Sequence, residues 1–595
     1  MLDLLNKHLY GFSDTFFKLC DKYVVILTGD RYDICNKRIF NFVPFICSIA
    51  NVPLTIFNVV CNKNDFTEYY KVLEQKSIRK ISSKLLKFLE DNQIEYTHEG
   101  EELLSHSHGQ LGADEIWRIH SGDYSKIECV DLVLYPTTTD QLNSIYENIK
   151  TQDGTYKIIP FGGGTNVTGC LLIHRVLESD YYISIDMRKY NKILQVNTEN
   201  NYAVIQSGAC GKEIEKALNA QGFTMGHEPD SYEFSTLGGW ISTNASGMQR
   251  NMYGNIEDIV IDFGYINKHS KKIDLRYPVR HSHGPNINSL FYGHEGNFGI
   301  ITEVLVNIKK LPADKYFNSI LFYNMTDGIA FLKEVYDENL RPSSIRLVDN
   351  EQFKFGQALK PEKTSFFEII IDKIKKFYLL KILGFNVDKM VACTLMIEGT
   401  KSSNKYTFNE IKRISTKYKA IFGGSENGRA GYNLTHSIAY IRDFTMDFRI
   451  MGETFETSVE WNKVELMAES VKQTLQKVSS KYIKSKPFLS YRVSQCYNTG
   501  ACVYFTFGFY NDDENSVERG IEIYHEMEKS MRETMTKFGG SISHHHGVGQ
   551  IKADELFLVT DKQQLEIHQQ IKDIFDKNKY FCNNNYMHYT DQREK

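Results

Sequence analysis

The pattern of apolar and polar positions divides the 595-residue chain into four segments. Residues 1–125 combine apolar runs with a Lys- and Glu-rich helical repeat, as in Ser77–Asn92, and predict a mainly helical N-terminal region. In residues 126–311, short β-branched runs alternate with glycine turns, which is typical of an α+β domain. The predicted strands of this segment are Cys129–Leu134, Tyr156–Ile159, Ile183–Ile185, Tyr202–Gln206 and Ile300–Ile308, with one helix over Lys212–Ala220.

The second half of the chain has longer helical repeats. Pro312 follows the last of these strands and marks a domain boundary, because proline ends regular elements. Residues 312–540 mix strands with amphipathic helices and predict a second α+β domain folded over the first, while residues 541–595 hold three consecutive histidines and one helix. The predicted helices of these two segments are Trp461–Ser480, Ser516–Phe538 and Asp561–Lys577.

Composition narrows the class of protein. Lys and Arg number 70 against 74 Asp and Glu, so the formal net charge of −4 gives no basic field that would favour nucleic acid as a partner. The cysteines form no Cys-x-x-Cys pair, which argues for a reducing compartment. No apolar run reaches the roughly 18 residues of a membrane span, and Asp3 does not fit a secretory signal. These features predict a soluble intracellular protein.

A glycine-rich loop follows the predicted strand Tyr156–Ile159. Three adjacent glycines remove every Cβ from the path, so consecutive backbone N–H groups can converge on a pyrophosphate, while a threonine and an asparagine add donors. The spacing fits neither a Rossmann turn nor a P-loop, and a flexible surface turn is the alternative. The candidate cofactor-binding residues of this loop are Pro160, Phe161, Gly162, Gly163, Gly164, Thr165 and Asn166.

Two further segments share this character. Residues 226–247 are dominated by small residues and hydroxyls, which let a flat ligand lie against bare backbone, although a pair of glycine turns explains the pattern equally well. Residues 293–303 form a glycine turn that feeds an apolar strand, as a simple hairpin also does. The candidates from both segments are Asp230, Ser231, Tyr232, Glu233, Phe234, Ser235, Thr236, Thr243, Asn244, Ala245, Ser246, Glu295, Gly296, Asn297, Phe298, Gly299, Ile300 and Ile301.

Together the three segments resemble, in order and spacing, the FAD-binding signature of the vanillyl-alcohol-oxidase type flavoproteins. More narrowly, motifs spread over much of the chain resemble the alkyldihydroxyacetonephosphate synthase family. Among them are His227-Glu228-Pro229-Asp230-Ser231, Ser344-Ile345-Arg346-Leu347, Tyr440-Ile441-Arg442-Asp443, Gly452-Glu453-Thr454-Phe455-Glu456-Thr457-Ser458 and Ser543-His544-His545-His546-Gly547-Val548-Gly549.

The resemblance implies an α+β fold with a two-subdomain FAD-binding domain over 126–311, an α+β cap for the substrate over 312–540, and a segment over 541–595 whose histidine loop returns to the FAD domain. It implies a transferase of ether-lipid biosynthesis that exchanges the acyl chain of 1-acyl-dihydroxyacetone phosphate for a long-chain fatty alcohol. The implied route is a covalent flavin N5 adduct without net redox change. FAD is expected to be held non-covalently, because the match has no histidine or cysteine at a flavin-linking position.

The resemblance also assigns roles to single residues. Tyr504 lies in an alternating strand, where pattern alone favours packing; the family match makes it the general acid and base for the C1 proton, provided that its neighbours lower its pKa. Arg442 is the expected clamp for the substrate phosphate, since a guanidinium fork binds phosphate bidentately. Arg346 and His227 are further substrate-binding candidates, for which an ion pair and a loop histidine are the alternatives.

His544, His545 and His546 are expected to border the active site and to assist Tyr504. We expect these three residues to lie on a strand, which sends alternate side chains to opposite faces, so three consecutive imidazoles would not share one metal ion. No metal is therefore expected.

Two rival functions share part of this pattern. One is an FAD-dependent dehydrogenase of a 2-hydroxy acid such as D-lactate, and the other is a flavin-binding relic that scaffolds an upstream acyltransferase at a membrane. A homodimer and a peripheral membrane contact are also expected. The candidate lipid-contacting segments are Phe42–Ile46, Leu54–Val60 and Phe366–Phe385. Burial in the core is the alternative for the first two, and a solvated basic helix is the alternative for the third.

The N-terminus bears on localisation. Met1-Leu2 and His8-Leu9 keep the spacing of an N-terminal peroxisomal address, but Met1 stands where that address has a basic residue. The C-terminal Arg593-Glu594-Lys595 is not the Ser-Lys-Leu address. The resemblance implies the peroxisome, and the cytosol is the alternative.

Overall fold

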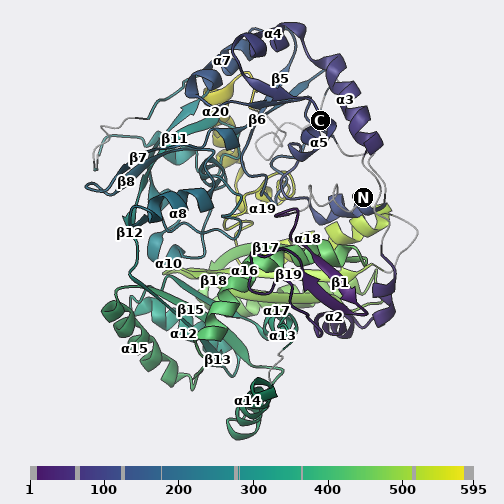
Figure 1. Cartoon of the computed structure of the whole chain (residues 1–595), viewed down its shortest axis with the longest axis vertical. Helices are drawn as coiled ribbons and strands as arrows, with labels where there is room; N and C mark the ends of the chain where they lie inside the picture. Colours follow the sequence, from purple (N-terminus) through teal and green to yellow (C-terminus); the bar gives the residue numbers. More distant parts are fainter. Residues whose placement is uncertain are drawn as a thin grey trace.

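The structure is a computed structural model that describes residues 10–60, 67–121, 128–173, 175, 177, 179–273, 279–280, 282–362, 366–511 and 517–581. Figure 1 shows two α+β units, one above the other, with the N-terminal strands beside the lower unit and the C-terminal helix in the upper one. Among the described helices, none has both the length and the apolar character that crossing a bilayer requires.

The upper unit is built on two four-stranded sheets. Its main strands are β3 (Glu95–Thr97), β4 (Leu132–Tyr135), β5 (Tyr156–Phe161), β6 (Tyr181–Asp186), β7 (Ile193–Asn197), β8 (Tyr202–Gln206), β10 (Val260–Ile266) and β11 (Ile300–Asn307). One sheet has the order β3-β4-β6-β5, with β4, β6 and β5 parallel, and the other has the antiparallel order β10-β11-β8-β7. A short pair, β9 (Phe223–Thr224) and β12 (Lys309–Lys310), lies beside them.

Helices cover these sheets and bury their apolar faces. They are α3 (Thr67–Lys80), α4 (Ser83–Asp91), α5 (Gly100–Ser105), α7 (Thr139–Ile149), α8 (Gly211–Asn219), α9 (Leu237–Thr243), α11 (Ile256–Ile259) and α20 (Lys562–Asp576). Two further helices, α6 (Ala113–Ser121) and α10 (Arg250–Tyr253), contact the lower unit instead. Helices α4 and α7 share a core with the parallel strands, and α8, α9 and α20 share one with the antiparallel sheet. The C-terminal segment therefore returns to the upper unit through α20.

The lower unit contains one seven-stranded antiparallel sheet, in the order β16-β13-β15-β14-β18-β19-β17. The strands are β13 (Asp314–Phe322), β14 (Ser344–Val348), β15 (Val391–Gly399), β16 (Ile421–Phe422), β17 (Ile450–Glu460), β18 (Phe488–Cys496) and β19 (Gly500–Tyr510). The helices are α12 (Met325–Asp337), α13 (Asn350–Ala358), α14 (Phe366–Phe377), α15 (Lys401–Lys417), α16 (Ser425–Met446), α17 (Val464–Ser479), α18 (Val517–Lys537) and, in the segment that follows, α19 (Leu556–Val559).

The helices of the lower unit have different partners. Helices α12, α15, α17 and α18 contribute to a large core with this sheet, whereas α16 runs along β13, β15 and β17. Helix α14 projects from the lower end of the molecule and continues into the π-helical turn η4 (Tyr378–Ile382).

The described part of the N-terminal region is mainly helical, as predicted, with helices α2 to α6, but it also contains a hairpin that was not predicted. Residues 17–27 form the hairpin β1 (Phe17–Asp21) and β2 (Val24–Leu27), and with α2 (Phe42–Ala50) they pack against α13 and α16 of the lower unit. The repeat at Ser77–Asn92 is not one helix, because α3 ends at Lys80 and α4 begins at Ser83. The helices predicted at 212–220, 461–480, 516–538 and 561–577 are confirmed within a few residues of their bounds.

Candidate functional site

One elongated cavity lies between the two units, and the three glycine-rich segments meet along its wall. Every residue of the first loop lines the cavity, as do most candidates from the other two segments. The cofactor candidates among the lining residues are Pro160, Phe161, Gly162, Gly163, Gly164, Thr165, Asn166, Asp230, Ser231, Ser235, Thr236, Thr243, Ala245, Ser246, Glu295, Gly296, Gly299, Ile300 and Ile301.

Six other candidates from these segments are not among the lining residues and pack elsewhere. Phe298 stacks on His294 in the core, and Asn244 has a left-handed conformation (φ 51°) that ends α9. Glu233 accepts hydrogen bonds from Lys212 and from Tyr32. The six are Tyr232, Glu233, Phe234, Asn244, Asn297 and Phe298.

The glycines are required by the close approach of two loops. A Cβ on Gly163 would lie 2.1 Å from the carbonyl oxygen of Phe234, and one on Gly162 would lie 2.4 Å from the hydroxyl of Thr236. Gly164 also has a positive φ of 64°. The cavity wall is therefore bare backbone, and its N–H groups and hydroxyls fit the diphosphate and flat ring of a flavin dinucleotide.

Tyr504 points into this cavity from β19. Its hydroxyl is 3.1 Å from the hydroxyl of Thr454, and its ring centroid is 5.4 Å from that of His546. Burial raises the pKa of Tyr504, although the nearby Arg492 guanidinium opposes this shift. The expectation that neighbours lower the pKa of Tyr504 is therefore wrong, and the phenol is protonated at neutral pH.

Arg442 lies on α16 and lines the cavity, but it is already paired. Its Nη1 donates to Glu453 at 2.8 Å, while Nε and Nη2 donate to Asp443 at 3.1 and 3.0 Å. Burial alone lowers the pKa of a guanidinium, but these two carboxylates offset the effect and raise the pKa of Arg442. Since arginine carries five N–H donors, two remain for a ligand.

Arg492 is a cavity residue that the sequence analysis missed. Its guanidinium carbon is 4.0 Å from the ring centroid of Tyr504, and its Nη2 is 3.4 Å from a carboxylate oxygen of Asp230. In the β-ladder, Arg492 of β18 is directly opposite Tyr504 of β19. The sequence contains one signal for Arg492, because it is the one charged residue within the strand Phe488–Cys496.

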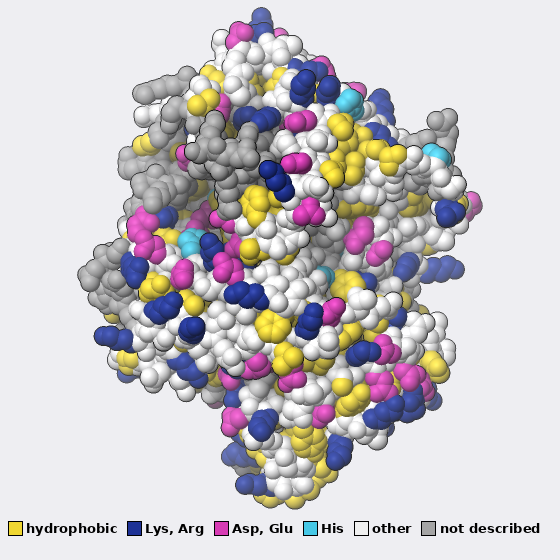
Figure 2. Space-filling model, turned by 180° about the vertical axis from the view of Figure 1, so that it is seen from behind, with side chains coloured by type: hydrophobic (Ala, Val, Ile, Leu, Met, Phe, Trp, Pro, Cys, Tyr) yellow, Lys and Arg dark blue, Asp and Glu magenta, His cyan; other side chains and the backbone are white. Residues whose placement is uncertain are grey.

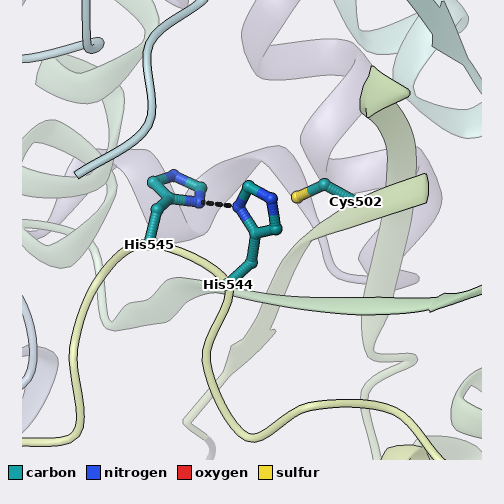
Figure 3. Close-up of side chains that lie close together, drawn as sticks. All are labelled: Cys502, His544 and His545. Carbon is teal, nitrogen blue, oxygen red and sulfur yellow. Dashed lines mark hydrogen bonds between the residues drawn. The ribbon is translucent and has the colours of Figure 1, made fainter. Parts of the chain in front are cut away.

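The three histidines do not lie on a strand, so the geometric argument for their separation is wrong. Residues 541–548 form a bent loop, and Figure 3 shows the rings of His544 and His545 side by side, with their Nδ1 atoms 2.9 Å apart. His545 and His546 line the cavity, whereas His544 turns away to the hydroxyl of Tyr497 at 2.5 Å. Burial lowers the pKa of His544 and His545 to about 3 and that of His546 to about 4, so all three are neutral at pH 7.

The loop also brings together two groups of potential metal ligands. A ligating atom of Cys502 lies within 4.8 Å of one from His544 and one from His545, and Glu456 forms a similar group with His545 and His546. In the first group both Nδ1 atoms are already joined by a hydrogen bond.

Glu456 holds the histidine loop and was not predicted. It is fully buried on β17, and its carboxylate accepts the backbone N–H groups of His544 at 2.5 Å and His546 at 3.0 Å, and the hydroxyl of Ser543 at 2.9 Å. Burial alone raises the pKa of a carboxyl, but the Lys552 ammonium, 3.5 Å away, and the imidazoles lower the pKa of Glu456 below its ordinary value. A second carboxyl, Glu295, binds the end of the same loop through the N–H groups of residues 548 and 549.

Arg346 and His227 are not among the residues that line the cavity. Arg346 is buried and donates to the hydroxyl of Thr435, which does line it, at 2.7 Å. His227 packs edge-on against Trp240, and burial lowers its pKa to about 3. Their positions indicate support of the cavity wall rather than contact with a ligand.

The far end of the cavity is apolar. Helices α2, α13 and α16 and strand β18 contribute apolar side chains there, most of which belong to one hydrophobic cluster. These include Ile46, Ile49, Phe355, Ile438, Ile441 and Phe488. This end fits a hydrocarbon chain.

The fold and the bare-backbone cavity define an FAD-linked flavoprotein. Residues 130–275 match the model described as "FAD binding domain", and residues 311–585 match "FAD linked oxidases, C-terminal domain". The predicted α+β fold and FAD as cofactor are thereby confirmed.

The chain belongs to the alkyldihydroxyacetonephosphate synthase family. It is 35% identical to the Caenorhabditis elegans alkyldihydroxyacetonephosphate synthase over 584 residues, covering 98% of this chain and 95% of that protein. A Dictyostelium discoideum relative with the same name is 30% identical, covering 81% of this chain and 76% of the relative. A solved alkyldihydroxyacetonephosphate synthase structure, at 24% identity, covers 97% of this chain and is itself covered to 99%; its TM-score of 0.76 shows the shared fold. The chain is thus an FAD-dependent enzyme of this family.

Proposed function

We propose that the chain exchanges the acyl chain of 1-acyl-dihydroxyacetone phosphate for a long-chain fatty alcohol, giving 1-alkyl-dihydroxyacetone phosphate and a fatty acid. The observation that supports this reaction best is one cavity that combines an FAD cradle, a tyrosine beside neutral imidazoles, two arginines and an apolar end. Bound, non-covalent FAD supplies the nucleophile of the exchange at N5, without net redox change.

Tyr504 handles the C1 proton of the substrate in this proposal. Because its phenol is protonated, it first donates its proton to the departing carboxylate of the acyl chain, and the phenolate that remains then accepts the C1 proton. His545 and His546 are neutral neighbours of this group, with ring centroids 6.0 and 5.4 Å from that of Tyr504.

The substrate phosphate binds to the two cavity arginines. Arg442 offers its two remaining donors, and Arg492 offers its guanidinium edge beside Tyr504. Guanidinium groups suit phosphate oxygens because of their planar fork. The hydrocarbon chain extends toward the apolar end, where Ile46 and Phe488 line the cavity.

The test is product formation from labelled alcohol. FAD-loaded protein incubated with 1-acyl-dihydroxyacetone phosphate and labelled hexadecanol is expected to place the label in an ether-linked, alkali-stable product and to release fatty acid. Reduction of a dye acceptor by D-lactate, with no label incorporated, would instead establish the hydroxy-acid dehydrogenase. If the protein binds FAD but catalyses neither reaction, the result would favour the remaining alternative, a flavin-binding protein that scaffolds an upstream acyltransferase.

We also propose that α14 and η4 dock on a lipid surface, from which both long-chain substrates are drawn. Figure 2 shows an apolar stripe flanked by basic side chains on the projecting lower end of the molecule. The exposed apolar side chains of this element are Ile370, Ile371, Ile374, Phe377, Tyr378 and Ile382. Lys373, Lys375, Lys376 and Lys381 are exposed beside them, and this arrangement suits an anionic bilayer surface.

Vesicle flotation tests this docking. The protein is expected to float with vesicles that contain anionic lipid, and Ile374→Asp with Phe377→Asp is expected to abolish flotation. Tyr406→Asp is a matched control, because Tyr406 is 65% exposed on α15. Equal flotation of all three proteins contradicts the proposal. Of the two other candidates, Phe42–Ile46 lies within α2, whose Phe42, Val43 and Ile46 are buried. Leu54–Val60 has Phe57 buried, while Leu54, Val59 and Val60 are exposed.

Three further proposals concern location and assembly. We propose a peroxisomal location, which imaging of the tagged chain tests; residues 1–9, which carry the address-like spacing, lie outside the described residues. We propose a homodimer, which light scattering tests, and an upstream acyltransferase as partner, which co-purification tests.

A further inference from the structure

The N-terminal segment supplies a residue to the reaction cavity. Tyr10 is among the lining residues, although the motifs that build the cavity begin 150 residues later, at Pro160. Its ring packs edge-on against Phe234 of the upper unit and Tyr440 of α16, with centroids 5.7 Å apart in each case. Tyr10 therefore lies at the junction of the two units.

The hydroxyl of Tyr10 is available to a ligand. It makes no hydrogen bond to another residue within the part of the chain that the structure describes. Burial, together with Tyr440, Asp230 and Glu233, raises the pKa of Tyr10, so the group is an O–H donor. Tyr10 is partly buried, and its hydroxyl can donate a hydrogen bond to a ligand in the cavity that it lines.

Close contacts fix the segment in this position. Gly11 has a φ of 96°, and a Cβ there would lie 2.3 Å from the hydroxyl oxygen of Tyr440. The backbone N–H of Phe12 donates to that same hydroxyl at 3.2 Å, and the Phe12 ring centroid is 4.6 Å from that of Phe234. Tyr32, after the β1–β2 hairpin, donates to Glu233 at 2.8 Å.

We propose that Tyr10 is a substrate-binding residue, held at the junction of the two units by the contacts of residues 11, 12 and 32, and that its hydroxyl donates a hydrogen bond to an oxygen of the bound substrate. The assignment rests on the proposed function for the identity of that substrate.

Tyr10→Phe removes only the hydroxyl and keeps the ring in place. In the FAD-loaded full chain, this variant is expected to raise the KM for 1-acyl-dihydroxyacetone phosphate about tenfold, the equivalent of one hydrogen bond to a charged oxygen, while kcat stays within about twofold. The Kd for FAD should not change. Tyr406→Phe, at an exposed position on α15, is the matched control and should behave as the parent protein.

A second measurement does not depend on turnover. Tyr10→Ala opens the cavity wall, so iodide is expected to quench the fluorescence of bound FAD more strongly than in the parent protein or in Tyr406→Phe. Unchanged quenching in Tyr10→Ala overturns the placement of Tyr10, whether or not the protein is active. If the parent protein forms the alkyl product and Tyr10→Phe keeps the parental KM, the substrate contact is wrong and the proposed function stands. If the parent protein forms no alkyl product, both the proposed function and the substrate contact of Tyr10 are wrong. The quenching measurement then still decides whether Tyr10 lies at the cavity wall.

Discussion

Glu456→Gln tests the idea that one buried carboxylate positions the histidine loop. The parent side chain accepts three backbone N–H groups and the Ser543 hydroxyl and lies 3.5 Å from the Lys552 ammonium. The amide keeps the shape but loses the charge, and its NH₂ group faces donors. Removing one partner from a buried charge pair costs about 3–5 kcal/mol, because the other charge stays buried and unpaired.

That cost predicts local opening of the loop rather than global unfolding. At 1.36 kcal/mol per tenfold, 3 kcal/mol corresponds to a loss of roughly 100-fold in hydrogen-exchange protection at the amides of His544 and His546. The rate of alkyl transfer should decrease together with this protection, while the Kd for FAD changes little. Glu460→Gln is the control, because Glu460 ends the same strand but is exposed in a pair with Lys463. Parental protection and activity in Glu456→Gln would refute the anchoring role.

Three further outcomes follow from the site. Tyr504→Phe is expected to lower alkyl transfer by about 10²–10⁴-fold, the usual worth of a general acid–base group, with the Kd for FAD unchanged; near-parental turnover contradicts its role. Arg492→Lys should raise the substrate KM about tenfold, because an ammonium replaces a bidentate fork, and an unchanged KM would assign the phosphate to Arg442 alone. The free energy of unfolding should decrease as pH falls from about 6.5 toward 4, because the unfolded chain binds protons that His544 and its two neighbours exclude in the fold. Urea unfolding at the two pH values measures this decrease. If a variant with all three histidines changed to Gln loses as much free energy of unfolding as the parent protein does, the prediction is wrong.

The sequence predicted the elements whose signal is local. The runs Tyr202–Gln206 and Ile300–Ile308 became β8 and β11, because β-branched residues between turns have few alternatives. The glycine segments were also informative, since a triple glycine is required where two loops approach as closely as Gly163 and Phe234 do. These signals were sufficient to predict the segments that meet along the cavity wall.

The features that were missed depend on contacts between distant residues. The β1–β2 hairpin is stable because it packs on α13 and α16, more than 300 positions away, and no local pattern encodes that contact. The bend at His544–His546 depends on Glu456, about 90 positions earlier. The protonated state of Tyr504 follows from burial by both units, which a strand pattern alone does not give.

The register of the lower sheet explains how these distant residues act together. Arg492 of β18, Tyr504 of β19 and Glu456 of β17 are direct cross-strand neighbours, so the three side chains form one row on the same face. A guanidinium above the phenol and a carboxylate that holds the imidazole loop are thereby fixed by backbone hydrogen bonds instead of by flexible loops. A slip of one residue in β19 would turn Tyr504 to the opposite face, where Phe455 and Phe505 pack in the core. The chemistry proposed for the cavity is therefore tied to strand pairing, while the loops supply the proposed cofactor cradle and the neutral imidazoles beside Tyr504.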